Sequence, residues 1–141
     1  EDVEKETRAR RVELDELLST SDLITLHVPL DRSTHHMIST RELAMMKSTA
    51  ILINACRGPV VDEAALTTAL QSGQIFGAGL DVLEQEPTPT DNPLLNMDNV
   101  VVTPHLASLS IESGIRSTDF AIANVSRLAR GEELESLVHP V

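Results

Sequence analysis

The chain has 141 residues, of which 41% are hydrophobic and 23% are charged, as expected for one globular domain with a core. Its formal net charge of -11 excludes a surface that follows nucleic-acid phosphates, and its two aromatic residues exclude extensive stacking on bases. One cysteine excludes an internal disulfide, and no apolar run approaches membrane-spanning length, so we expect a cytoplasmic protein without nucleic-acid or membrane partners.

Apolar runs predict four β-strands, at residues 23–28, 50–53, 75–82 and 100–102. These runs are nearly continuous rather than alternating, which is typical of strands buried on both faces of a parallel sheet. We expect a further short strand at residues 10–12.

Amphipathic segments predict helices between these strands. Short helices are expected at residues 14–19 and 41–46. Asp62 is expected to cap a helix that ends near Gly73, and a final helix should end before Gly131. This alternation of strands and helices predicts an α/β fold with an open, doubly wound parallel sheet of Rossmann type.

Polar residues follow each predicted strand at the same edge of the sheet. His27 lies near the end of the first strand, residues 54–57 follow the second, Asp81 lies near the end of the third, and His105 follows the fourth. Because ligands bind at the carboxyl ends of strands in such sheets, the sequence predicts a site at this edge.

Arg57 and His105 are the candidates for substrate binding and for acid–base chemistry. The guanidinium fork of Arg57 matches a carboxylate, and Gly58 allows a tight backbone turn beside it. His105 can exchange a proton near neutral pH, and Pro104 restricts the backbone next to it. The simpler interpretations are a surface salt bridge for Arg57 and a loop histidine for His105.

Two acidic residues lie close together after the third strand. A carboxylate at Glu86 would stabilise an imidazolium and fix its orientation, and Glu84 is the alternative for this role. The simpler interpretation of both is an acidic loop on an acidic protein.

Asp81 and Cys56 also lie at the predicted site. Asp81 ends an apolar strand and needs a partner, because unpaired burial of a carboxylate is costly. A nicotinamide amide or ribose could be that partner, and so could a nearby loop. Cys56 is expected to be a small packing residue rather than a nucleophile. No spacing in the sequence predicts a metal site.

Three motifs together resemble the D-isomer-specific 2-hydroxyacid dehydrogenases. They are residues 54–66, residues 77–82 with Glu86 before proline, and residues 103–105, and the resemblance spans about residues 13–140. It implies that Arg57 binds the substrate carboxylate and carbonyl, that His105 is the acid–base, and that Glu86 is its partner.

The resemblance also implies contacts with a nicotinamide cofactor. NAD is expected, and NADP stays open. Asp81 would contact the nicotinamide end, whereas Pro29 and Thr34 would line the adenosine and phosphate side. The full set of implied cofactor contacts is His27, Pro29, Thr34, Ala55, Cys56, Arg57, Asp81, His105, Ala107 and Ser108.

The family's glycine-rich loop, its ribose-binding acidic residue and its separate substrate domain have no counterpart in this sequence. We therefore expect residues 1–141 to be the C-terminal portion of the NAD-binding domain, inactive alone. The expected function of the full-length homodimer is hydride transfer between NAD(P)H and a small 2-oxo or 2-hydroxy acid of the glyoxylate/hydroxypyruvate, phosphoglycerate or D-lactate type. The alternative is an NAD-dependent, corepressor-like binding module of the same family.

Overall fold

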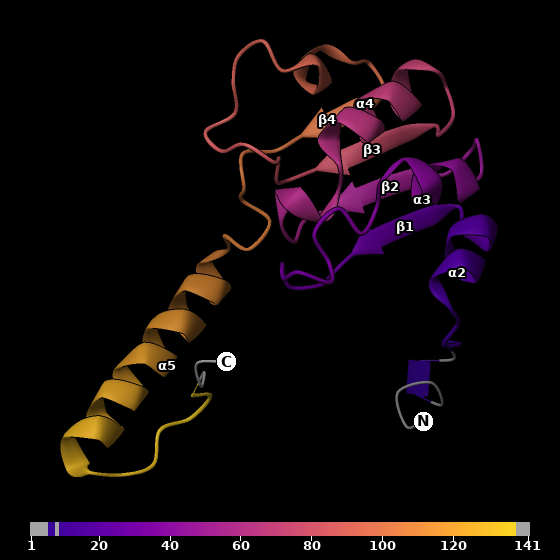
Figure 1. Cartoon of the computed structure of the whole chain (residues 1–141). Coiled ribbons are helices and arrows are strands. Elements are labelled where there is room, and N and C mark those ends of the chain that lie inside the picture. The colour runs from indigo at the N-terminus through magenta and orange to yellow at the C-terminus, as the bar shows by residue number, and fades with distance from the viewer. Residues whose placement is uncertain (1–5, 8, 138–141) are drawn as a thin grey trace. The chain divides into compact units, whose positions relative to one another are not determined.

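Four parallel strands form one sheet, in the order β1-β2-β3-β4 (Figure 1). The computed structural model describes residues 6–7 and 9–137. The chain divides into two units, Glu1–His105, which contains the sheet, and Leu106–Val141. Along the first unit the elements are α2 (Leu14–Thr20), β1 (Leu23–Leu26), α3 (Thr40–Met45), β2 (Ile51–Asn54), the 3₁₀ turn η1 (Gly58–Val60), α4 (Glu63–Gln71), β3 (Gly77–Leu80), the 3₁₀ turn η2 (Pro93–Asn96) and β4 (Val100–Val102).

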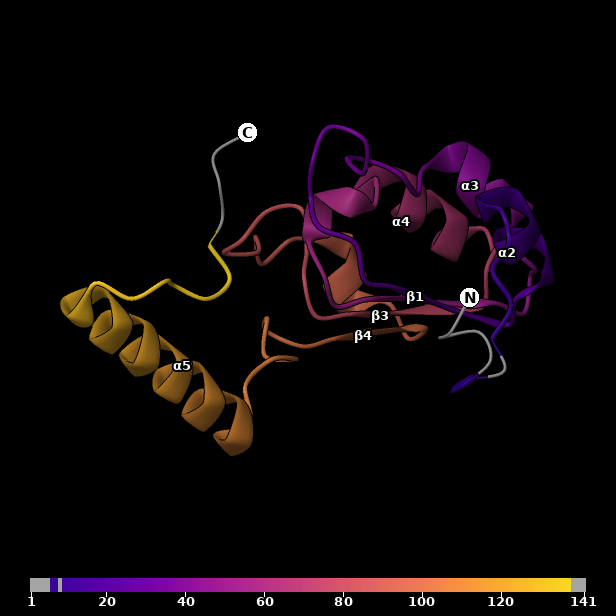
Figure 2. The ribbon, with the colours of Figure 1, turned by 90° about the horizontal axis from the view of Figure 1, so that it is seen from below.

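The helices of this unit lie on one face of the sheet. Figure 2 shows α2, α3 and α4 together on the same side of the strands. This face carries every second strand residue, and the register aligns Ile24 with Leu52 and Leu52 with Ala78. The core between sheet and helices includes Leu18, Ile24, Ile38, Leu43, Leu52, Val60, Leu66, Leu70, Ile75, Ala78, Leu80 and Leu94.

Within the unit Glu1–His105, helices cover only one face of the sheet, so the predicted burial on both faces is not found in this unit. Burial alternates along β1 and β2, and on the uncovered face Leu23 is 58% exposed and Val101 is 70% exposed. The reason is topological, because right-handed crossovers between strands that follow one another along the sheet place their helices on the same side. Apolar residues on both faces gave no sequence signal of this asymmetry.

The predicted elements are otherwise confirmed, with shifted ends. The first strand stops at Leu26, and the third extends only from Gly77 to Leu80. The predicted strand at residues 10–12 is absent, since residues 9–13 have no regular structure. The Arg10 side chain there pairs with Glu16 of α2.

The predicted cap of α4 is confirmed. The Asp62 carboxylate accepts a hydrogen bond from the Ala65 N–H (3.0 Å) and another from the Ser39 hydroxyl (2.8 Å). These two donors lower the pKa of Asp62. Two residues beyond the end of α4, Gly73 has φ of 70°, a left-handed conformation that favours glycine.

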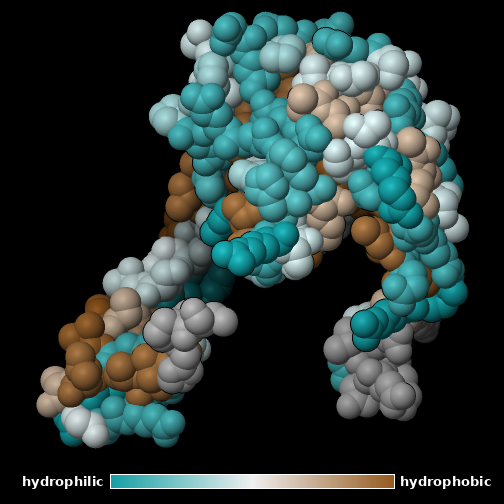
Figure 3. All heavy atoms as spheres, viewed as in Figure 1, coloured by the Kyte–Doolittle hydropathy of each residue, from teal (hydrophilic) through white to brown (hydrophobic). Residues whose placement is uncertain are grey.

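The second unit consists mainly of α5 (Ile111–Arg130). The Ser110 side chain caps it by accepting from the Ser113 N–H (3.0 Å), and the helix ends at Gly131 with φ of 69°. None of its residues is buried, and hydrophobic side chains gather on its surface (Figure 3). Among the residues that the structure describes, no helix is long and apolar enough to cross a membrane.

Candidate active site

Backbone hydrogen bonds continue past the ends of the strands and align the loops that follow them. The Asp81 N–H donates to the Asn54 carbonyl (2.9 Å), and the His105 N–H donates to the Asp81 carbonyl (2.9 Å). His105 has φ of 55°, a left-handed conformation that is uncommon for residues other than glycine. Such backbone strain is often found at functional sites. The predicted clustering after β2, β3 and β4 is therefore present.

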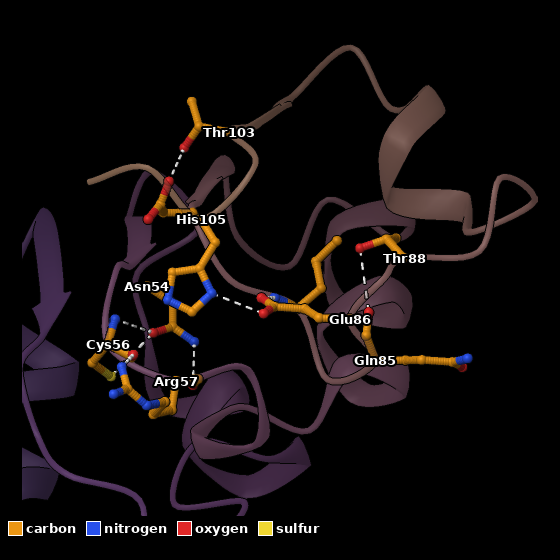
Figure 4. Close-up of polar contacts among 10 residues, drawn as sticks. Asn54, Cys56, Arg57, Gln85, Glu86, Thr88, Thr103 and His105 are labelled. Atoms are coloured by element: carbon orange, nitrogen blue, oxygen red, sulfur yellow. Dashed lines mark hydrogen bonds and ion pairs between the residues drawn. The ribbon is translucent and has the colours of Figure 1, made fainter. Parts of the chain in front are cut away.

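His105 and Glu86 form a direct pair. The His105 Nδ1 lies 2.8 Å from a Glu86 carboxylate oxygen, and Figure 4 shows the imidazole pointing toward that carboxylate. The other oxygen of Glu86 accepts from the Leu83 N–H (3.2 Å). The hydrogen bond with His105 lowers the pKa of Glu86 against the opposing effect of burial, and the Leu83 N–H lowers it further. Because Nδ1 faces Glu86, Nε2 is the ring nitrogen directed to other partners.

The pair borders a cavity of about 780 Å³. Carboxylate and imidazole groups meet apolar side chains in its wall, which is a common composition for a small-molecule site. The lining residues are Asp81, Leu83, Glu86, Pro87, Thr88, Leu95, Val100, Val102, Thr103, Pro104 and His105.

Glu84, the alternative partner for His105, points elsewhere. Its carboxylate pairs with Nε2 of His36. The rings of His35 and His36 stack with centroids 4.1 Å apart. The two carboxylates of this loop therefore serve different histidines, and the geometry favours Glu86 as the partner of His105.

Arg57 is exposed at the carboxyl end of β2. Its Nη1 donates to the Cys56 carbonyl (2.6 Å). Within residues 6–7 and 9–137, no carboxylate lies within ion-pair distance of the guanidinium. The described residues therefore do not support the simpler interpretation of Arg57 as half of a surface salt bridge. Its positive charge is available to bind an anionic ligand.

Asn54 shapes the loop that carries Arg57, a role that sequence reasoning missed. The residue is 1% exposed, and its side chain donates to the Arg57 carbonyl (2.9 Å) and accepts from the Cys56 N–H (3.1 Å). The Cys56 thiol also donates to it (3.1 Å), which fits the expected packing role of the cysteine. The available signal was a polar residue at a buried strand position, which must find partners.

Asp81 has a protein partner. Its side chain is in a residue only 7% exposed and accepts from the Thr103 hydroxyl (2.5 Å). This contact supports the loop-partner interpretation of Asp81, and sequence reasoning did not identify Thr103. The bond also ties the segment before His105 to the end of β3.

Of the three predicted residues after β1, Pro29 and Thr34 belong to one local turn, whereas His27 contacts the strand. His27 Nε2 lies 3.0 Å from the Thr25 hydroxyl. The Thr34 hydroxyl donates to the Pro29 carbonyl (2.7 Å) and accepts from the Asp31 N–H (2.8 Å). The sheet order separates this turn from His105 by β2 and β3, so these residues lie at the same edge but outside the His105–Glu86 pair.

Ala107 and Ser108 belong to the second unit, Leu106–Val141. Ala55 is exposed beside Cys56. The cofactor contacts assigned to these residues stay predictions.

Known proteins with similar sequences share this segment. The family described as "D-isomer specific 2-hydroxyacid dehydrogenase, NAD binding domain" matches residues 1–107. Glyoxylate reductase of Korarchaeum cryptofilum is 50% identical over 139 residues, which are 99% of this chain and 42% of that protein. Glyoxylate/hydroxypyruvate reductase B of Serratia proteamaculans is 49% identical over 140 residues, 99% of this chain and 43% of that protein.

Solved structures agree with the sequence comparison. D-lactate dehydrogenase with NAD+ from Lactobacillus jensenii gives a TM-score of 0.86 at 38% identity, over 92% of this chain and 43% of that chain. The holo form of Rhodotorula graminis D-mandelate dehydrogenase gives a TM-score of 0.92 at 35% identity, over 99% of this chain and 41% of that chain. The chain thus spans less than half the length of these relatives. It belongs to the D-isomer specific 2-hydroxyacid dehydrogenase family, and residues 1–107 match the family's NAD binding domain.

Proposed function

We propose that the full-length protein transfers a hydride between NAD(P)H and a small 2-oxo or 2-hydroxy acid. The observation that carries this proposal is the 2.8 Å contact between His105 and Glu86 at the edge of the sheet where Arg57 is exposed. An imidazole with a fixed orientation and a cation without a carboxylate partner in the described chain are the groups that this reaction needs.

The three residues of the proposed site have different roles. Arg57 binds the substrate carboxylate with its two-pronged guanidinium and polarises the carbonyl. In reduction, His105 donates the proton that the carbonyl oxygen takes up, and in oxidation it removes that proton from the hydroxyl. Glu86 stabilises the protonated imidazole and holds Nδ1 toward itself.

The residues at the end of β2 suit a nicotinamide cofactor. Ala55 is exposed and Cys56 is half-buried, so small side chains leave the backbone of this loop accessible to a flat ring. We propose that Ala55, Cys56, Arg57 and Asp81 hold the nicotinamide end, and that Pro29 and Thr34 face the adenosine and phosphate side. The bound cofactor supplies or accepts the hydride.

Among substrates, the glyoxylate/hydroxypyruvate type has the strongest support. Two relatives with these substrates in their names are 50% and 49% identical to the chain, whereas the D-lactate dehydrogenase structure is 38% identical. We further propose a cytoplasmic homodimer. The unburied apolar side chains of α5, including Ile115, Ile122 and Val125, support a further packing partner.

The test is an absorbance assay of NADH and NADPH oxidation by the full-length protein. It offers glyoxylate, hydroxypyruvate, pyruvate and phosphohydroxypyruvate in turn. We expect turnover with glyoxylate or hydroxypyruvate, and a loss of about 10²–10⁴-fold in kcat for His105→Ala, as for other general acid–base residues. The matched control is His35→Ala, an exposed histidine outside the site. Cofactor binding without turnover of any of these acids would refute the dehydrogenase proposal.

A further inference from the structure

We propose that Glu63 is a positioning residue for His105 and acts through the loop that carries Glu86. The proposal rests on the function proposed above, in which His105 exchanges the proton. Glu63 is the first residue of α4 and is half-buried. None of the roles in the reaction that the resemblance implies was assigned to Glu63.

One carboxylate fixes two distant points of the loop. One oxygen of Glu63 accepts from the Glu84 N–H (2.9 Å), and the other accepts from the Asn92 side-chain amide (2.6 Å). Glu86 lies in the segment 84–92 that these two bonds delimit. The carboxylate therefore holds both ends of this segment against the start of α4.

The Asn92 end is itself fixed to the core. Asn92 is 8% exposed, and its side-chain oxygen accepts from the Leu94 N–H (3.0 Å), which caps η2. Leu94 is 1% exposed in the hydrophobic core. The Asn92 amide that reaches Glu63 thus belongs to an anchored residue, and the bond connects Glu63 to a fixed point.

The Glu84 end of the segment lies close to two carboxylate–histidine pairs. The Glu84 carboxylate pairs with His36, and Glu86, two residues after Glu84, pairs with His105. The bond from the Glu84 N–H to Glu63 fixes the position of the backbone that carries both side chains. A shift of this backbone would change the distance from Glu86 to His105.

The His105–Glu86 pair cannot hold the loop unaided. The two side chains are 48% and 39% exposed, and ion pairs this exposed to solvent contribute little. Asp81, directly after β3, is a further titratable group near the pair, and its charge opposes ionisation of Glu86. Precise contact between Glu86 and His105 therefore depends on anchors elsewhere in the loop, and Glu63 provides two of them.

The experiment compares pH profiles of kcat for 2-oxo acid reduction in the full-length protein. The variants are Glu63→Ala, Glu63→Gln, Glu86→Gln and the double variant Glu63→Ala/Glu86→Gln. Glutamine keeps one acceptor oxygen and can serve only one of the two donors well. Asp91→Asn is the matched control, because it removes an exposed negative charge from the same segment.

We expect Glu63→Ala to move the profile to lower pH in the same direction as Glu86→Gln, with a smaller shift for Glu63→Gln. KM for the 2-oxo acid should change less than twofold. On the Glu86→Gln background, Glu63→Ala should add no further shift, because the effects of two residues that act through the same contact with His105 are not additive. Asp91→Asn should leave the profile in place.

Two results would overturn the proposal. If Glu86→Gln shifts the profile and both Glu63 variants leave it unshifted, Glu63 has no positioning role and the proposed reaction stands. If the double variant shows the sum of the two shifts, Glu63 acts on His105 independently of Glu86. Glu63→Gln keeps the test valid if Glu63→Ala fails to fold. A wild-type protein without turnover would instead refute the proposed function, which distinguishes the two failures.

Discussion

Gly58→Ala should displace the loop that carries Glu86 while leaving the sheet intact. Gly58 begins η1, next to Arg57, and packs directly against the backbone after β3. A Cβ atom at this position would lie 1.9 Å from the Leu83 carbonyl oxygen and 2.6 Å from the Glu84 nitrogen. Backbone atoms cannot rotate away as a flexible side chain can, so one of the two segments must move.

The size of the movement follows from these distances. Real Cβ atoms stay at least about 3.0 Å from other heavy atoms, so the separation between the two segments must grow by about 1.1 Å. If the loop takes up this shift along the Glu86–His105 direction, their 2.8 Å contact lengthens to at most about 3.9 Å, outside hydrogen-bond range. A misplacement of about 1 Å at a reacting group can cost about 100-fold in rate. We expect kcat to fall by about this factor.

Steady-state kinetics of the full-length protein measure this loss, and circular dichroism establishes that the variant is folded. Gly79→Ala is the control, because its Cβ would meet only Ile53 at 3.7 Å, an ordinary contact. A folded Gly58→Ala protein with kcat within twofold of wild type would show that the loop yields without disturbing His105, and the reasoning would fail.

Three further substitutions test individual contacts. Glu86→Gln should move the pH profile of reduction to lower pH, because the charge that stabilises the imidazolium is lost. A hydrogen bond to a charged group contributes about 1.5–3 kcal/mol. Because the two side chains are 39% and 48% exposed, solvent screening reduces the expected shift of the profile to less than about one pH unit. An unchanged profile would show that Glu86 is not the partner of His105. Arg57→Lys should lower kcat/KM by about 10–100-fold through loss of two-pronged carboxylate binding, and a change below threefold would contradict that role. Asp62→Ala should cost about 1 kcal/mol in urea unfolding at neutral pH. Because the pKa of Asp62 is lowered in the folded state, this stabilisation is present above the ordinary value of 3.8 and is lost as the pH falls through the lower folded value, so the difference between the variant and wild type should narrow in acid.

The sequence was sufficient for the strand–helix order, the cap at Asp62 and the edge at which chemistry gathers. Each of these depends on local signals, such as apolar runs, a capping residue before a helix, and polar residues directly after a strand. The pairing of His105 with Glu86 was also predicted, from the resemblance rather than from spacing. The structure adds that Glu84 pairs with His36 instead of His105, and the spacing of the two glutamates alone could not predict which one contacts His105.

The supporting contacts could not be predicted in the same way. Glu63 reaches Glu84 and Asn92 across 21 and 29 residues, and no local pattern specifies which donors meet a given carboxylate. Likewise, apolar residues on both faces of the strands could not reveal that the helices of the unit Glu1–His105 all lie on one face of the sheet. Asn54 was the exception, since a buried amide in a strand must have partners, and asking which ones could have identified its role.

The sheet order has a consequence for how the chain can fold. Each strand pairs with the strand that follows it, so the three pairings join residues separated by about 28, 26 and 22 positions. Closure entropy rises only slowly with loop length, so the three steps carry nearly equal costs. None of these three pairings needs a distant part of the described chain, so β1 to β4 can pair one strand at a time, in the order in which a ribosome releases them.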